Sequence, residues 1–357
     1  MLRAEELLRT GRGDEALRLL DGALAEANHD VAMLCARAMI RANQAQTLGA
    51  RADVDLALEF DPNCALAYRI RGMLRVPLGD YPGALQDVEL AIRLDPSDRT
   101  ARRNHASLLS AMNRLDEALK EFDSLLKSDP DDGASLVGRA TTWEFKGEWK
   151  KCLRDVEKAI RLEPEPGSSK SHYLRARALR QLGRLPEALK ALAKVLEIDP
   201  DDGLVFVERT LIWLSLGKPK LALSDAEAGV KHQPKDGAAW AHLGHARAMG
   251  GDHPGAIMAY EQGLELDPKM APAWANLGAI RFQSEDYPGA IKAPTRAIEI
   301  KHDPSALLNR GRAYAYAKDI KNALADFEHA LRHAEPGSAE AREGERLAAM
   351  ARAQLAR

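Results

Sequence analysis

The feature that most constrains this chain is a set of prolines that recur about every 34 residues. The steps between successive members are 34, 34, 34, 36, 34, 34, 36 and 32 residues. The set consists of Pro62, Pro96, Pro130, Pro164, Pro200, Pro234, Pro268, Pro304 and Pro336. A period between about 20 and 50 residues is typical of an array of stacked units, so it decides the fold before any local pattern does.

Small residues recur with the same period at two positions of the repeat; we call each set of equivalent positions a column. One column holds Ala16, Ala50, Ala84, Ala118, Cys152, Ala188, Ala222, Ala256, Ala290 and Ala323. The other holds Ala38, Gly72, Ala106, Ala140, Ala176, Thr210, Gly244, Gly278 and Gly311. Small side chains at fixed sites let two helices approach closely, so each block is predicted to be a pair of antiparallel helices that touch at these columns.

The residues between the helices support this division. Glycine lies midway through most blocks, where a residue with positive φ would end the first helix, and Asn113 tolerates the same conformation. The glycines are Gly11, Gly79, Gly147, Gly183, Gly217 and Gly251. An acidic residue followed by proline ends the second helix of each pair. Residues 44–46 carry Gln-Ala-Gln in place of glycine, and we expect the first helix to continue there.

The block at residues 237–270 carries a recognisable motif. It has Trp240, Leu243 and Gly244 in its first half, followed by Ala256 and a closing Asp-Pro. These landmarks resemble the tetratricopeptide repeat, with its W-x2-L-G pattern followed by alanine and proline. The resemblance extends over nearly the whole chain. It implies an all-α, right-handed superhelical solenoid whose first helices line a concave groove for a peptide or a partner helix.

The repeats suggest a division of the chain. Residues 1–30 contain a partial repeat, residues 31–337 contain nine tandem repeats, and residues 338–357 form an amphipathic helix that caps the stack. Residues 163–171 contain two additional residues and a Gly-Ser-Ser sequence, which makes this joint the best candidate for a hinge. A slightly longer surface turn with no mechanical role is the favoured explanation.

The chain departs from the family pattern in two ways. Pro294 lies about two turns inside a predicted second helix, where proline costs ~3 kcal/mol, so we predict a bend within residues 288–300 and a weakened interface with the last repeat. Arginine often replaces the leucine that the family prefers before the small residue. The arginines concerned are Arg37, Arg71, Arg139, Arg175, Arg209 and Arg310.

Charge and composition limit the choice of partner. With 51 basic and 53 acidic residues, the net charge of -2 gives no electrostatic reason to expect nucleic acid or an anionic membrane as partner. No stretch approaches the roughly 18 apolar residues of a membrane span, and the N-terminus does not resemble a secretion signal. We therefore expect a cytoplasmic protein that binds proteins or peptides, with self-association through its terminal helices as a further option.

The family resemblance implies where the groove residues lie. The predicted groove residues are Met39, Arg69, Met73, Arg103, Asn104, Phe145, Tyr173, Arg177, Arg180, Leu211, His242, His245, Asn276, Phe282, Asn309 and Arg312. This mixture of apolar residues and arginines suits an amphipathic or moderately acidic segment, because arginine pairs with carboxylates and apolar side chains anchor the ligand.

Two specialised versions of this groove are not matched. The carboxylate clamp that binds acidic C-termini needs a set of lysine, asparagine and arginine residues over three consecutive repeats, and only Arg103 and Asn104 are similar to it. The asparagine ladder of the O-linked N-acetylglucosamine transferases needs asparagine in nearly every groove helix. Only Asn104, Asn276 and Asn309 fit that requirement.

No catalytic, cofactor or metal site is predicted. His242 and His245 are three residues apart, and His329 and His333 are four apart, but zinc normally takes three or four ligands. Cys35, Cys64 and Cys152 have neither metal nor redox spacing. Phosphate-binding glycine loops and nucleophile motifs were not found.

Together these features predict a non-enzymatic scaffold that binds a peptide segment or a partner protein in its groove. The alternative is a regulatory or targeting region of a larger enzyme, of kinase or glycosyltransferase type, whose catalytic domain lies outside this chain. The incomplete first repeat slightly favours that alternative, and the composition of a groove specifies only a class of ligand.

Overall fold

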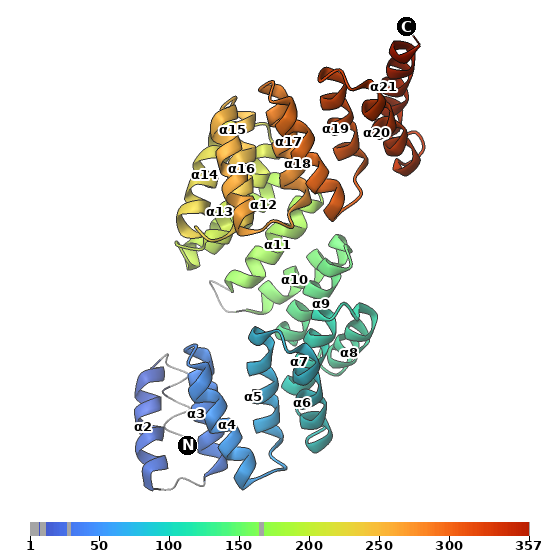
Figure 1. Ribbon diagram of the computed structural model, residues 1–357. Helices are drawn as coiled ribbons and strands as arrows, with labels where there is room; N and C mark the ends of the chain where they lie inside the picture. Colours follow the sequence, from blue (N-terminus) through green and yellow to red (C-terminus); the bar gives the residue numbers. More distant parts are fainter. Residues whose placement is uncertain (1–6, 8–11, 27–29, 164–167, 357) are drawn as a thin grey trace. The chain divides into compact units, whose positions relative to one another are not determined.

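The structure is a computed structural model, and it describes residues 7, 12–26, 30–163 and 168–356. The described part of the chain is helical and contains no strand (Figure 1). The helices are α2 (Gly13–Glu26), α3 (Val31–Asn43), α4 (Thr47–Phe60), α5 (Ala65–Arg75), η1 (Val76–Leu78), α6 (Tyr81–Leu94), α7 (Arg99–Ala111), α8 (Leu115–Ser128), α9 (Gly133–Phe145), α10 (Trp149–Leu162), α11 (Ser169–Gln181), α12 (Leu185–Ile198), α13 (Gly203–Ser215), α14 (Pro219–His232), α15 (Gly237–Met249), α16 (His253–Leu266), α17 (Ala271–Gln283), α18 (Tyr287–Ile300), α19 (Pro304–Tyr316), α20 (Ile320–His333) and α21 (Ala339–Leu355).

The chain divides into two compact units, Met1–Gly183 and Arg184–Arg357. Within each unit, consecutive helices pair and each pair packs on the next. This arrangement confirms an all-α solenoid of stacked helix pairs. The division falls after Gly183, C-terminal to the candidate hinge at residues 163–171, of which residues 164–167 lie outside the described residues.

The turns between paired helices follow the predicted chemistry, with one exception. Gly79, Gly147, Gly183, Gly217 and Gly251 have φ between 64° and 85°, and Asn113 has φ 62°, as predicted; Gly11 lies outside the described residues. The expected continuation of the helix through residues 44–46 is wrong, because α3 ends at Asn43 and Ala45 itself adopts φ 58°. An alanine in this conformation costs roughly 1–2 kcal/mol, which the packing of both flanking helices must offset.

Aspartate residues fix the start of most first helices. Asp30, Asp98, Asp132, Asp202 and Asp236 are N-cap residues whose carboxylates accept a hydrogen bond from a backbone N–H of the first turn. Such a cap contributes about 1 kcal/mol and satisfies one of the unpaired N–H groups at the helix end. Two of these caps also contact the preceding first helix, since Asp98 pairs with Arg69 and Asp132 with Arg103.

The small-residue columns lie at the contacts between helices. All the alanines of the two columns that the structure describes are buried. A Cβ at Gly244 would lie 2.9 Å from Tyr260 Cγ, and a Cβ at Gly311 would lie 2.5 Å from Phe327 Cε1. The glycines therefore make room for an aromatic ring sixteen residues further on.

The prediction of a bend at Pro294 is wrong. Helix α18 runs from Tyr287 to Ile300 as one α-helix with Pro294 inside it. The proline ring is buried against Gly278, where a Cβ would lie 2.4 Å from Pro294 Cγ. Helix α18 also packs on α19, and its Ile298 contacts the cluster that contains Leu307. Tertiary packing thus holds the helix where local propensity would break it.

We expect Gly278→Ala to destabilise the second unit by about 1–3 kcal/mol, because the new methyl group would overlap the ring of Pro294. Equilibrium urea unfolding followed by circular dichroism measures this loss. The matched double variant, Gly278→Ala with Pro294→Ala, removes the ring and should recover most of it. A single variant as stable as the wild type would show that the backbone shifts without cost.

Candidate binding site

The predicted groove residues lie on the first helices of the pairs, and all are at least partly exposed. In the first unit these helices are α3, α5, α7, α9 and α11; in the second they are α13, α15, α17 and α19. Met39, Met73 and Phe145 expose 37%, 44% and 57% of their surface. The first helices of the first unit thus carry three exposed apolar side chains among the predicted groove residues.

Four arginines of the predicted groove have carboxylate partners within the chain. Arg69 Nε lies 2.9 Å from an oxygen of Asp98, and Arg177 Nη1 lies 2.8 Å from Glu144. Arg312 pairs with Glu343 of α21. These ion pairs join neighbouring helix pairs, so the arginines stabilise the stack, and a carboxylate of a ligand would have to compete with the chain's own carboxylates.

Asp132 is the centre of the densest of these contacts. Its carboxylate accepts hydrogen bonds from Ser135 Oγ at 2.7 Å, from Arg99 Nη2 at 3.1 Å and from Arg103 Nη1 at 3.1 Å. Burial by itself would raise the pKa of Asp132, but the hydrogen bonds from Ser135 and Arg99 and the charge of Arg103 outweigh it and lower the pKa to about 2. The ionised form is therefore the one that the fold stabilises.

The stability of the first unit should depend on the ionisation of Asp132. The pKa of Asp132 is lower in the folded protein than in the unfolded chain. Its contribution to the free energy of unfolding is therefore complete above the unfolded pKa of 3.8 and is lost as the pH falls through about 2. The shift corresponds to about 1–2 kcal/mol once solvent screening of the partly exposed partners is allowed for. Urea unfolding between pH 5 and pH 2 should show a shallower pH dependence for Asp132→Asn than for the wild type. Equal slopes would contradict this assignment.

An apolar pocket opens between α5 and α7, and we call it the α5–α7 pocket. Its volume is about 250 Å³. It is lined by Gly72, Met73, Val76, Val88, Asn104, Ser107, Leu108 and Ala111. The side-chain nitrogen Nδ2 of Asn104 is buried and has no hydrogen-bond partner among the described residues. A buried donor without an acceptor is costly, so Asn104 is a polar position that the free protein leaves unsatisfied.

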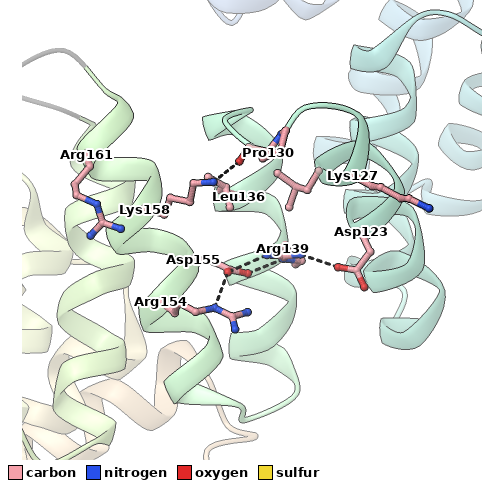
Figure 2. A pocket seen from close by; sticks show the side chains of 10 residues that line it. Asp123, Lys127, Pro130, Leu136, Arg139, Arg154, Asp155, Lys158 and Arg161 are labelled. Atoms are coloured by element: carbon pink, nitrogen blue, oxygen red, sulfur yellow. Dashed lines mark hydrogen bonds and ion pairs between the residues drawn. The ribbon is translucent and has the colours of Figure 1, made fainter.

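A second pocket lies between α8 and α10, and we call it the α8–α10 pocket (Figure 2). Its volume is about 420 Å³. Leu126, Leu136 and Pro130 provide its apolar lining. The charged lining residues are Asp123, Lys127, Arg139, Arg154, Asp155, Lys158 and Arg161. Cations therefore outnumber carboxylates in this pocket.

Arg139 in the α8–α10 pocket belongs to a series of buried ion pairs, which we call the Arg–Asp ladder. In each pair, an arginine of a first helix binds an aspartate sixteen residues later in the second helix. The pairs are Arg37–Asp53, Arg71–Asp87, Arg139–Asp155, Arg209–Asp225 and Arg310–Asp326. These arginines replace the leucine of the family pattern, and their partners make the replacement possible.

In the second unit, the predicted groove residue Phe282 joins Tyr287 and Tyr316, with ring centroids 5.0–5.9 Å apart. Tyr316, which the sequence reading did not select, exposes 64% of its surface. Burial lowers the pKa of His245, so the imidazole is neutral near pH 7.

Reactive side chains come together at two separate places in the structure: three histidines at one, and two cysteines at the other. His302 lies beside the His329 and His333 rings, with centroids 4.9–5.8 Å apart, but among the described residues no group of three histidine, cysteine or acidic side chains is arranged to hold a metal. Cys35 and Cys64 are distant in sequence, yet their sulfur atoms lie 3.9 Å apart. Both are free thiols, and burial raises the pKa of Cys35 to about 12.

Sequence reasoning missed the α8–α10 pocket, although a signal for it was present. Lys150, Arg154, Lys158 and Arg161 follow one another at helical spacing along α10, so they share one side of this helix.

Of the described helices, none is long and apolar enough to cross a membrane.

Stacked helix pairs with exposed pockets on both sets of helices define a helical-repeat scaffold. Segments 78–139, 169–202, 214–271 and 304–334 match profiles of the family described as Tetratricopeptide repeat, and together they cover about half of the chain. The chain belongs to the tetratricopeptide repeat family.

A curated relative agrees with this assignment. The Small glutamine-rich tetratricopeptide repeat-containing protein 2 of Mycosarcoma maydis is 35% identical over 73 residues, which is 20% of this chain and 21% of that protein. The match thus spans about a fifth of the relative's length.

Two solved structures share the fold over most of this chain. The crystal structure of the APC/C hetero-tetramer Cut9-Hcn1 matches with a TM-score of 0.63 and 15% identity, over 98% of this chain and 82% of that one. The human IFIT1 dimer with PPP-AAAA matches with a TM-score of 0.60 and 18% identity, over 92% and 88% of the two chains. At this identity the likeness shows the fold alone.

Proposed function

We propose that this protein is a non-enzymatic interaction scaffold that binds an extended or helical segment of a partner protein on the first helices of its first unit. The α5–α7 pocket is the central anchor point of this surface. Its volume of about 250 Å³ and its mainly apolar lining suit one large apolar side chain of the ligand.

The observation that carries the proposal is Asn104. Its Nδ2 is buried at the pocket without an acceptor, while Met73 beside it stays 44% exposed. Once the Asn104 amide turns toward the pocket, a backbone carbonyl of the bound segment would satisfy it, and the adjacent side chain of that segment would cover Met73. One ligand residue thus removes both unfavourable features of the free protein.

The ion pairs of the groove refine the kind of ligand that we expect. Because Arg69 and Arg103 are bound to Asp98 and Asp132, the surface next to the pocket carries little unbalanced positive charge. We therefore propose that apolar contacts and hydrogen bonds to the ligand backbone provide the affinity here, rather than pairing with ligand carboxylates.

A peptide library displayed on phage and selected against the full chain tests the proposal. The selected peptides, synthesised with a fluorescent label, should bind Ser107→Trp at least tenfold more weakly than the wild type, because the indole would fill the pocket. Asn104→Ala should weaken binding by about tenfold, which corresponds to 1.4 kcal/mol and is typical of one lost buried hydrogen bond.

Leu211→Trp is the matched control, because Leu211 occupies the position of Ser107 in a repeat of the second unit. Its affinity for the selected peptides should equal that of the wild type. Peptides that bind Ser107→Trp normally, or that lose affinity only with Leu211→Trp, would move the binding site away from the α5–α7 pocket.

A further inference from the structure

Helix α10 carries a larger excess of positive charge than any other second helix. It contains five lysine and arginine residues and two acidic residues, within a chain whose net charge is -2. The next most basic second helix, α18, has two basic residues and one acidic residue. A local charge of this kind is a feature of one surface and not of the repeat pattern.

The positive charges of α10 form a stripe along one side. Lys150, Arg154, Lys158 and Arg161 are spaced by four, four and three residues, so they lie on adjacent turns. The stripe is about 16 Å long at a rise of about 1.5 Å per residue. Figure 2 shows Arg154, Lys158 and Arg161 extending from α10, while Lys127 extends from α8 with its amino group directed outward.

Internal carboxylates neutralise only part of this charge. Arg139 binds both Asp155 and Asp123, with Nε at 2.6 Å and Nη1 at 2.7 Å, so these two carboxylates are already engaged. Lys158 pairs with Asp131 at 3.0 Å. Arg154 shares Asp155 at 3.3 Å and keeps 68% of its side chain exposed.

Among the described residues, three further cations have no carboxylate partner: Lys127, Lys150 and Arg161. Exposed arginine and lysine side chains at helical spacing match carboxylates presented at the same spacing by another chain.

We infer that the α8–α10 pocket, with the stripe on α10, is a second docking surface, which binds an acidic amphipathic segment of a partner protein. Glutamate or aspartate residues of that segment pair with Arg154, Arg161 and Lys127. An apolar side chain of the segment rests on Leu126 and Leu136 between them. This surface is distinct from the α5–α7 pocket and goes beyond the function proposed above.

The lining favours a polypeptide over a nucleic acid. The described residues that line the pocket include no aromatic side chain on which a base could stack. They do include Leu126, Pro130 and Leu136, which suit an aliphatic or aromatic side chain of a peptide.

The test uses the full chain and a fluorescein-labelled synthetic helical peptide that carries glutamate at every third or fourth position and one leucine in each turn. Fluorescence anisotropy at low salt should detect binding that weakens steeply as ionic strength rises. The double variant Arg154→Glu with Arg161→Glu should lower the affinity at least tenfold. The milder Arg154→Gln with Arg161→Gln should lower it by a smaller factor, and circular dichroism should show both variants folded.

The matched control is Lys190→Glu with Lys292→Glu. Lys190 on α12 and Lys292 on α18 are exposed and occupy the repeat position of Arg154, and the control changes the net charge by the same amount. This control should change the affinity for the acidic peptide less than twofold. Ser107→Trp, in the α5–α7 pocket, should leave that affinity unchanged. Wild-type affinity in the Arg154→Glu, Arg161→Glu variant, or an equal loss in the control, would overturn the inference. Tighter binding of a single-stranded oligouridine or of anionic vesicles at the same residues would overturn it as well.

Discussion

Arg310→Leu is expected to lower the free energy of unfolding of the second unit by about 3–5 kcal/mol, because it removes one partner of a buried ion pair and leaves the other charged. Asp326 exposes only 8% of its side chain and accepts two hydrogen bonds, both from Arg310, at 2.7 and 2.8 Å. Without the guanidinium, its carboxylate must stay ionised in a desolvated place or take up a proton. Either outcome costs free energy.

The chain itself provides the design that should reverse this loss. In two repeats of the second unit the Arg–Asp ladder is replaced by an apolar pair, Leu243 with Ala259 and Leu277 with Ala293, and all four residues are buried. The double variant Arg310→Leu with Asp326→Ala copies that pair. We expect it to recover to within about 1 kcal/mol of the wild type, since an apolar pair of suitable volume replaces a buried ion pair at little cost.

Urea unfolding and hydrogen exchange of α19 and α20 together measure this effect, because a repeat array can lose one end without unfolding as a whole. Arg296→Leu is the control. Its ion pair with Glu299 is mostly exposed, so we expect a change below about 1 kcal/mol. A double variant no more stable than Arg310→Leu alone would show that the ladder does more than balance its own buried charge.

The fold could be predicted from the sequence because its signals repeat. The closing proline, the glycine between paired helices and the small residues at the helix contacts recur in block after block. Each of them determines local structure within its own block. The exceptions are single positions where tertiary packing overrides local preference. Pro294 stays within a continuous helix because Gly278 leaves room for its ring, and that contact is sixteen residues away in the chain.

The sequence predicted which helices carry the selected residues, but not the partners of those residues within the chain. The first helices do expose the selected residues, yet the partners of Arg69 and Arg103 are the N-cap aspartates Asp98 and Asp132, each twenty-nine residues later. The arginines that replace the family's leucine look like irregularities within a single block. When the blocks are aligned, the aspartate sixteen residues later shows that these arginines form ion pairs. Pocket volumes depend on rotamers, and no sequence pattern specifies these directly.

Phe122→Ala is expected to destabilise the first unit by about 3–5 kcal/mol, the usual cost of deleting a fully buried aromatic ring. Phe122 exposes 1% of its surface and packs with Ala106 of its own helix pair and with Leu125. Its ring also reaches the next pair, because a Cβ at Gly138 would lie 2.5 Å from Cε1 and Cζ. Hydrogen exchange should accordingly rise in both α7 and α9, and not in α8 alone.

The effect of Gly138→Ala on the free energy of unfolding should reverse when Phe122 is replaced by alanine. In the wild type, Gly138→Ala places a methyl group against the ring and should cost about 1–3 kcal/mol. In the Phe122→Ala background the same methyl group fills part of the void, and alanine is about 1 kcal/mol better than glycine inside a helix, so the substitution should stabilise. Phe145→Ala, at an exposed aromatic position, should cost less than about 1 kcal/mol in either background. A destabilising Gly138→Ala in both backgrounds would mean that the glycine is required by the α8–α9 contact itself rather than by the ring.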